Sequence, residues 1–279
     1  MKLKKRATLS KFLTIRPQDA VCDLYFPESV DDIVRFTVLE RDYHLLGGGS
    51  NVIAGAVRKP VITLALLEGR SATEDIDNRQ VAVSMPAWVR VAPLIDYLIA
   101  NGLTGLEFMA GIPGTVGGAI VGNAAPKGHS WDGIVRSVVY VKEGSVMTAS
   151  PRFGYRRILD MPEPPYILLA AELILAKDTA AKIKERVRGF MKERITIPYP
   201  SAGSLFRNPD GASAGKLLEE AGCKGLAMGD AALYEKHANI VVNKGNARSA
   251  DFVALREEAI ARVQKKHGIH LEPEVRFWQ

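Results

Sequence analysis

The chain has 279 residues, of which 47% are hydrophobic and 24% charged, with a net charge of +6. This length suits one large domain or two to three small ones, and it is enough to bury a sizeable core. The composition argues against a nucleic-acid-binding protein, because no basic run is interleaved with aromatic residues and no zinc-finger or helix-turn-helix spacing occurs.

The sequence also argues against a membrane protein. The basic residues 1–6 are followed by no apolar stretch, so we expect a solvated tail there rather than a signal peptide. The longest apolar stretch, residues 166–176, is interrupted by Glu172 and is too short to span a bilayer. Cys22 and Cys223 form no disulfide framework, and the histidines are scattered, so we expect a cytoplasmic protein without a metal site.

Short strands and helices alternate in the first half of the chain. Ser29 is predicted to cap a helix that carries Asp31 and Asp32 in its first turn, and Gly102 to end a helix over residues 93–101. Strands are expected at residues 20–26, 43–46, 61–66 and 80–85.

The second half begins with a predicted hairpin, and its character changes at Asp178. The hairpin joins residues 134–142 to 145–149, and a strand that is expected to carry a bulge follows at 166–176. Beyond Asp178 we expect a charged helix (179–194), an extended linker (195–200), helices capped by Ser213 and Ser249, and strands at 239–243 and 271–278. Because strands are joined through both hairpins and helices, an α+β fold is favoured, with a domain boundary near residue 178.

Two glycine-rich segments are the most informative feature. Residues 47–51 read GGGSN, and residues 105–119 read GLEFMAGIPGTVGGA, with five glycines within fourteen residues. Glycine lets a backbone turn sharply and approach a ligand closely. Neither segment fits a Rossmann or Walker loop. Each alone is as consistent with a simple turn, but together they suggest one phosphate-bearing cofactor held in two places.

Four other segments contain residues that suit chemistry. Ser204 lies in PSAGSLFRNP (200–209), although a capping or turn serine is the simpler interpretation. Arg156 in FGYRR (153–157) has the planar fork that clamps a carboxylate, or is an ordinary surface arginine. Glu272 and Glu274 fall on one face of the predicted last strand, where carboxylates are usually solvated. His237 is a candidate acid or base, although lone histidines are more often structural.

In this order, the segments resemble the UDP-N-acetylenolpyruvoylglucosamine reductase family. The matching motifs are GGGSN, GLExxxGIPGTVGGA, FGYR, SAGSxFxNP, a KHA segment and LExEVR, and they run from residue 47 to residue 276. The glycine motifs alone indicate a wider class of flavoproteins. The serine motif and the terminal glutamate motif are specific to the reductases.

The resemblance implies an α+β fold with a two-lobed FAD-binding region of the vanillyl-alcohol-oxidase type and a C-terminal α+β substrate-binding domain. The FAD-binding region is expected over residues 1–177, split near residue 60 and completed by the terminal strand 271–279. The substrate-binding domain is expected over residues 178–270.

The resemblance also implies a reaction in two stages. NADPH reduces a non-covalently bound FAD, and hydride then passes to C3 of the enolpyruvyl group of a UDP-sugar substrate. Ser204 is expected to protonate C2. Arg156 is expected to neutralise charge on the substrate carboxylate, and Glu274, if protonated, to donate a hydrogen bond to it.

The remaining site residues follow from the same resemblance. Tyr155, Asn208 and a basic residue are expected to bind substrate; Arg188, Lys192 and Arg194 all qualify as the diphosphate ligand, with Lys192 and Arg194 preferred. The expected cofactor-binding residues are Gly47, Gly48, Gly49, Ser50, Asn51, Gly111, Ile112, Pro113, Gly114, Thr115, Gly117, Gly118 and Ala119.

The chain departs from the family pattern in three places. Ile15-Arg16-Pro17 replaces an early pair of glycines, Ala125 replaces a glycine, and Tyr234 replaces a serine. These departures leave open another FAD-dependent oxidoreductase of the same fold, or a non-catalytic flavin-binding paralogue. The presence of Arg156, Ser204 and Glu274 favours the reductase.

Overall fold

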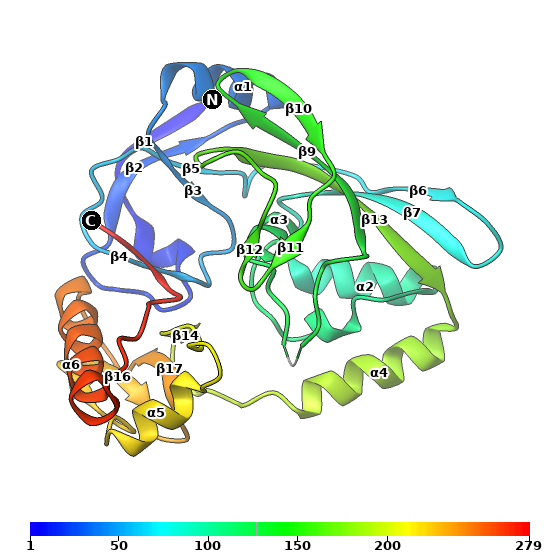
Figure 1. Ribbon diagram of the computed structural model, residues 1–279. Coiled ribbons are helices and arrows are strands. Elements are labelled where there is room, and N and C mark those ends of the chain that lie inside the picture. The colour runs from blue at the N-terminus through cyan, green and yellow to red at the C-terminus, as the bar shows by residue number, and fades with distance from the viewer. Residues whose placement is uncertain (127) are drawn as a thin grey trace. The chain divides into compact units, whose positions relative to one another are not determined.

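The computed structural model describes residues 1–126 and 128–279, which form two compact units (Figure 1). The first unit comprises residues 1–3, 25–48 and 60–195, and the second comprises residues 4–24, 49–59 and 196–279. The predicted domain boundaries near residues 60 and 178 remain predictions. Within the described residues, no helix combines the length and apolar character needed to cross a bilayer.

The first unit is built on an antiparallel sheet with the strand order β10-β9-β13-β7-β6, in which β8 also pairs with β13. The hairpin predicted around Glu143-Gly144 is present, and the pairing of β13 with β9 shifts register twice, as the expected bulge requires. The strands are β6 (Ala72–Asp75), β7 (Gln80–Pro86), β8 (Leu103–Thr104), β9 (Val135–Lys142), β10 (Ser145–Ala149) and β13 (Ile167–Lys177).

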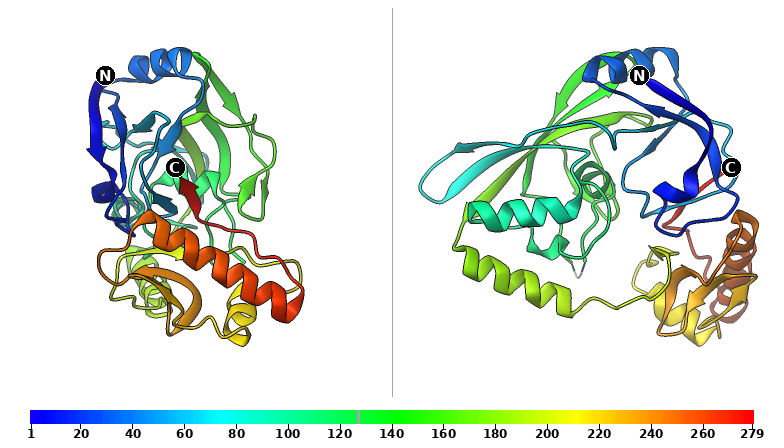
Figure 2. Two further views of the ribbon diagram at one scale, coloured as in Figure 1. Left: turned by 90° about the vertical axis from the view of Figure 1, so that its left-hand side faces the viewer. Right: turned by 180° about the vertical axis from the view of Figure 1, so that it is seen from behind.

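Helices cover this sheet and bury its core. The helix α2 (Val91–Asn101) ends at Gly102, whose φ of +62° is the left-handed conformation of a glycine cap. It begins two residues before the predicted Pro93, because proline is tolerated in a first helical turn. Beside it lie the short α3 (Val116–Val121) and the 3₁₀ helix η2 (Glu107–Met109), and α4 (Ala180–Lys192) packs against α2 (Figure 2).

A smaller sheet has the order β1-β2-β5-β3 and packs beside α1 (Val30–Leu39), whose cap Ser29 accepts a hydrogen bond from the amide of Asp32 at 3.2 Å. The solvated tail predicted at residues 1–6 is wrong, because Lys2–Thr8 form the strand β1. Its side chains are nevertheless mostly exposed. Lysines of this kind are typical of an edge strand that must not pair further. The other strands are β2 (Val21–Phe26), β3 (His44–Leu46) and β5 (Val61–Thr63).

The second unit contains an antiparallel sheet of order β14-β17-β16-β15 with two helices packed on it. The helix α6 begins at Ser249 rather than after it, because the Asp251 carboxylate accepts from the amide of Arg248, while Ser249 is bonded to Asp19. The elements are β14 (Ser201–Ser204), β15 (Ala227–Met228), β16 (Ala231–Tyr234), β17 (His237–Asn243), α5 (Ala214–Glu220), α6 (Ser249–His267) and the 3₁₀ helix η1 (Leu9–Phe12).

The last strand of the chain is shorter than predicted. The expected strand over 271–278 reduces to β18 (Arg276–Trp278), which pairs in parallel with β4 (Val52–Ala54). Residues before it bond instead to the segment after β14: the carbonyl of Glu272 accepts from the amide of Arg207, and the amide of Glu274 donates to the carbonyl of Leu205.

Candidate active site

The two glycine segments meet within the first unit. A Cβ atom on Gly48 would lie 2.3 Å from the Cα of Gly114, and one on Gly47 would lie 2.9 Å from the Thr115 hydroxyl. Gly114 itself has a φ of +137°. Any side chain at position 48 would force the loops apart, so glycine is required here for contact between the loops.

Part of the second glycine loop is fixed by hydrogen bonds within the protein. The Thr115 hydroxyl caps α3 by accepting from the amide of Gly118, and the amides of Val116 and Gly117 donate to the carbonyls of Val89 and Ala87. These three amides are therefore used inside the protein. Residues 111–114 are exposed or half-buried, whereas Thr115, Gly117 and Ala119 are buried.

The end of the first loop belongs to the second unit and holds the segment that carries Glu274. The Asn51 side-chain amide donates to the Glu274 carbonyl at 3.1 Å, and the Asn51 carbonyl accepts from the amide of Arg276. Gly49 has a φ of +67°, and a Cβ there would lie 1.9 Å from the carbonyl oxygen of Phe12. Two motifs 223 residues apart are thus joined by hydrogen bonds.

A backbone hydrogen bond joins the segments that carry Ser204 and Glu274. The amide of Glu274 donates to the carbonyl of Leu205, the residue after Ser204, at 2.8 Å. Both residues are half-buried rather than fully solvated. The register shift of β14 between Ser201 and Gly203 and the pairing of Ser204 with Ile240 on β17 set the position of the serine.

Asn239 holds this arrangement and was not singled out in the sequence. It is 4% exposed, its side-chain oxygen accepts from the amide of Phe206, and its side-chain NH₂ donates to the Phe206 carbonyl. Its own carbonyl accepts from the amide of Leu205 at 2.7 Å. The signal for it was available, since Asn239 directly follows the KHA segment.

Arg156 and Tyr155 form the turn of a two-residue hairpin between β11 (Phe153–Gly154) and β12 (Arg157–Ile158) in the first unit. Arg156 has a φ of +57°, and its guanidinium donates to the Ala125 carbonyl at 3.3 Å. Asn123 donates to the Gly154 carbonyl at 2.9 Å, which ties the hairpin to the residues that follow α3. Ala125, one of the departures from the family pattern, thus contributes its backbone oxygen.

The basic candidates near the end of α4 differ in environment. Arg194 donates to the carbonyls of Phe108 and Ala110 at 2.8 and 3.0 Å, and burial lowers the pKa of its guanidinium. Lys192 and Arg188 are exposed on α4. Arg194 therefore braces the second glycine loop, while the other two face solvent.

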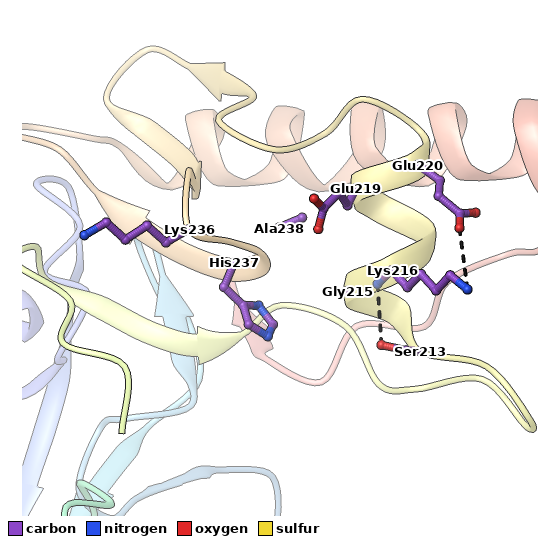
Figure 3. Close-up of a pocket in the computed structure, with 8 residues that line it drawn as sticks. All are labelled: Ser213, Gly215, Lys216, Glu219, Glu220, Lys236, His237 and Ala238. Carbon is purple, nitrogen blue, oxygen red and sulfur yellow. Dashed lines mark hydrogen bonds and ion pairs between the residues drawn. The ribbon is translucent and has the colours of Figure 1, made fainter. Parts of the chain in front are cut away.

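Asn208 and His237 lie near the start of α5 in the second unit. The Asn208 side chain accepts from the amide of Ala214, and His237 lines a cavity of about 460 Å³ (Figure 3). His237 also accepts, through Nδ1, from the amide of Asn239 at 3.3 Å. The cavity is lined by Ser213, Gly215, Lys216, Glu219, Glu220, Lys236, His237 and Ala238.

The other two departures have clear structural consequences. Arg16 adopts a φ of +52°, a conformation that glycine enters without strain, and the carbonyls of Ile15 and Arg16 accept from Asn243. Tyr234 is 2% exposed, and its hydroxyl donates to the Thr196 carbonyl at 3.4 Å. Both substitutions are accommodated within the second unit.

Comparison with known proteins finds two protein-family matches along the chain. Residues 24–150 match the FAD binding domain, and residues 195–278 match the UDP-N-acetylenolpyruvoylglucosamine reductase C-terminal domain. These matches and the mixed helix and sheet content confirm the predicted α+β fold, with an FAD-binding region and a distinct C-terminal domain.

Relatives that match most of this chain are UDP-N-acetylenolpyruvoylglucosamine reductases. The UDP-N-acetylenolpyruvoylglucosamine reductase of Geotalea uraniireducens is 37% identical over 84% of this chain and 79% of the relative. That of Syntrophus aciditrophicus is 36% identical over 93% and 85%. The crystal structure of the enzyme (MurB) from Thermus caldophilus superimposes with a TM-score of 0.83 at 30% identity over the whole of both chains. The chain therefore belongs to the UDP-N-acetylenolpyruvoylglucosamine reductase family of FAD-dependent oxidoreductases.

Proposed function

We propose that this protein uses NADPH to reduce the enolpyruvyl group of UDP-N-acetylglucosamine enolpyruvate, which yields UDP-N-acetylmuramate, a peptidoglycan precursor. The observation that carries the proposal is the 2.8 Å hydrogen bond from the Glu274 amide to the Leu205 carbonyl. This bond joins Glu274, the expected hydrogen-bond donor to the substrate, to the residue that follows Ser204, the expected proton donor.

The first unit suits a non-covalent FAD. The two glycine loops meet closely, since Gly48 lies against the backbone of Gly114 and Gly47 against the Thr115 hydroxyl, and residues 111–114 are exposed or half-buried. Neither loop contains a histidine or cysteine to which a flavin is commonly attached. When bound, FAD supplies the carrier that takes hydride from NADPH and passes it to the substrate. Ser50 and Asn51 complete the first loop.

Ser204 is proposed as the proton donor. Hydride addition at C3 of the enolpyruvyl group leaves negative charge at C2 and on the neighbouring carboxylate. A serine hydroxyl is a weak acid, but an enolate carbon is basic enough to accept its proton. Ser204 is half-buried and fixed by strand pairing, which suits a group that must be held at one atom.

Arg156 and Glu274 are proposed to stabilise that charge. The planar fork of Arg156 matches a carboxylate, and its position in a tight hairpin turn limits its motion. Glu274, in its protonated form, would donate a hydrogen bond to the same group. Tyr155, Lys192 and Asn208 are proposed to bind the rest of the substrate. Lys192 is a better diphosphate ligand than Arg194, because Arg194 is engaged with two backbone carbonyls.

The decisive experiment is turnover by the purified yellow protein. NADPH oxidation should depend on the enolpyruvyl sugar nucleotide, and the product should be two hydrogen atoms heavier by mass spectrometry. NADPH oxidation that is indifferent to this substrate would point to another oxidoreductase. A yellow protein without any turnover would point to a non-catalytic paralogue.

A further inference from the structure

Arg90 lies where the two glycine loops meet. It is an exposed residue that directly precedes α2, and it was not among the residues expected to bind the cofactor. Its Nη1 atom would lie 3.2 Å from a Cβ on Gly48, the position at which the first loop touches Gly114.

The backbone of Arg90 is fixed to the second loop from both sides. Arg90 forms an isolated antiparallel bridge with Thr115. The amide of Val91 donates to the Gly114 carbonyl at 3.1 Å, and the amide of Val116 donates to the Val89 carbonyl at 2.8 Å. The side chain therefore starts from a rigid position beside the loop tip.

The guanidinium of Arg90 is turned toward the first loop. Its Nη1 donates to the Gly48 carbonyl at 3.3 Å. A guanidinium carries five N–H donors, and this bond uses one of them. In the described parts of the chain, 1–126 and 128–279, no carboxylate forms an ion pair with Arg90. A positive charge thus stands at the junction of the loops without a protein counter-ion.

We propose that Arg90 binds the diphosphate of FAD. This rests on the proposed function, in which FAD lies along the two loops. The amides of Val116, Gly117 and Gly118 at the start of α3 donate within the protein, so the positive charge that a diphosphate needs does not come from them. A guanidinium that bonds a loop carbonyl on one side and phosphate oxygens on the other supplies that charge and holds the loops together.

The test compares FAD affinity in apoprotein prepared from the wild type and from two variants, Arg90→Gln and Arg90→Lys. Titration is followed by flavin fluorescence at low and high salt, with ADP as a competitor that carries the diphosphate without the flavin. Arg41→Gln is the matched control, because Arg41 is also exposed in the first unit but pairs with Glu143 at 3.3 Å, away from the loops.

We expect Arg90→Gln to weaken FAD binding by about 10- to 100-fold. ADP competition should weaken by a similar factor, and the salt dependence of FAD affinity should become shallower, because salt screens an interaction that the variant lacks. Arg90→Lys should retain the salt dependence with intermediate affinity, and Arg41→Gln should match the wild type.

Two outcomes would overturn the proposal while leaving the proposed function intact. In one, Arg90→Gln binds FAD as tightly as the wild type. In the other, it binds FAD more weakly but with an unchanged salt dependence and unchanged ADP competition, which is the behaviour of a purely structural contact to Gly48. A wild-type protein that binds no FAD would instead refute the proposed function.

Discussion

At the scale of single residues, glycine is needed at position 48 because the two loops are in contact there, and not because the backbone needs an unusual φ. We expect Gly48→Ala to lose FAD, because the added Cβ would fall 2.3 Å from the backbone of Gly114 and must displace one loop. The flavin content of the purified protein measures this. Gly189→Ala is the control, a glycine-to-alanine change that we expect to stabilise the protein rather than to disturb it. Gly189 lies in α4 with nothing within 4 Å of its Cβ position. That change should leave the flavin content unchanged and stabilise the fold by up to about 1 kcal/mol.

Ser204 can be tested by separating the two half-reactions. Ser204→Ala should leave reduction of the flavin by NADPH nearly intact, and slow its reoxidation by the enolpyruvyl substrate by about 100- to 10,000-fold. Stopped-flow absorbance follows both. Ser201→Ala is a useful comparison, since the Ser201 hydroxyl in the same strand donates to the Val241 carbonyl and is structural. Equal slowing of both half-reactions in Ser204→Ala would assign Ser204 a structural role too.

Glu274 offers a graded series. A glutamine can still donate a hydrogen bond through its amide, so Glu274→Gln should retain part of the activity, whereas Glu274→Ala should lose much more of the second half-reaction. Neither change should release FAD, because it is the backbone of Glu274 that bonds to Leu205 and Asn51. Glu272→Ala, two residues away and exposed, should behave as wild type. Normal turnover by Glu274→Ala would mean that the carboxylate is merely solvated.

At the scale of elements, two arginines attach α4 and the residues after it to η2: Arg186 lies within the helix, and Arg194 lies two residues beyond its end. Arg186 donates to the Glu107 carboxylate at 2.9 Å and to Asp178 at 2.7 Å, and Arg194 donates to the carbonyls of Phe108 and Ala110. Glu107 is 4% exposed and also accepts from the Thr104 hydroxyl and the Gly105 amide. This buried carboxylate therefore fixes the strand-to-loop turn that leads into the second glycine loop.

The pKa of Glu107 makes this attachment sensitive to acid. Burial alone would raise its pKa, but the hydrogen bonds from Thr104, Gly105 and Arg186 together hold it below the ordinary value of 4.5. A lowered native pKa contributes stability that is present above the ordinary value and is lost as pH falls through the native one. We expect Glu107→Gln to cost about 1–3 kcal/mol at neutral pH, and the difference from the wild type to shrink below about pH 4.5.

Urea unfolding across a range of pH measures both parts of this expectation. Asp160→Asn is the control, because Asp160 forms a 2.6 Å ion pair with Arg152, whose side chain is 77% exposed. Such a surface pair should contribute only about 0–1 kcal/mol. A Glu107→Gln cost that stays constant down to acid pH would show that the charge of Glu107 is not what stabilises the turn.

At the scale of the whole molecule, the proposed FAD should act as a ligand of the native state alone. Added FAD should raise the melting temperature of the apoprotein, with a stabilisation of about 2.7 kcal/mol at a free concentration one hundred times the dissociation constant. Acid precipitation should then leave the yellow colour in the supernatant, as a non-covalent cofactor requires. Colour that remains in the pellet would contradict this.

Local features of the fold could be predicted from the sequence, while long-range pairings could not. Ser29 and Gly102 mark helix ends because a cap depends on neighbouring residues, and the hairpin at Glu143-Gly144 depends on its own turn. The pairing of β18 with β4 depends on residues more than 220 positions apart, so no local pattern could set its length. The basic strand β1 was missed because its side chains are mostly exposed.

The candidate site shows the same division. The motifs identified Ser204, Arg156 and Glu274, whose side chains have the reactive groups. Asn239 was missed because its importance lies in the backbone atoms it bonds, those of Phe206. Arg90 was missed because it lies outside both glycine motifs in the sequence, and only the fold brings it to Gly48. A buried side-chain amide that bonds both the N–H and the C=O of another residue has no distinctive sequence pattern of its own.

The pairing of the chain's last strand with β4 has a consequence for how the protein is made. The second unit is assembled from residues 4–24, 49–59 and 196–279, so its first two segments leave the ribosome long before their partners exist. Until Arg276–Trp278 are synthesised, β4 lacks its parallel neighbour, and Asn51 lacks the Glu274 carbonyl to which it donates. A chain terminated early therefore lacks both the proposed catalytic glutamate and the strand that completes the fold. Contacts of such high sequence separation also favour slow folding that finishes only after translation.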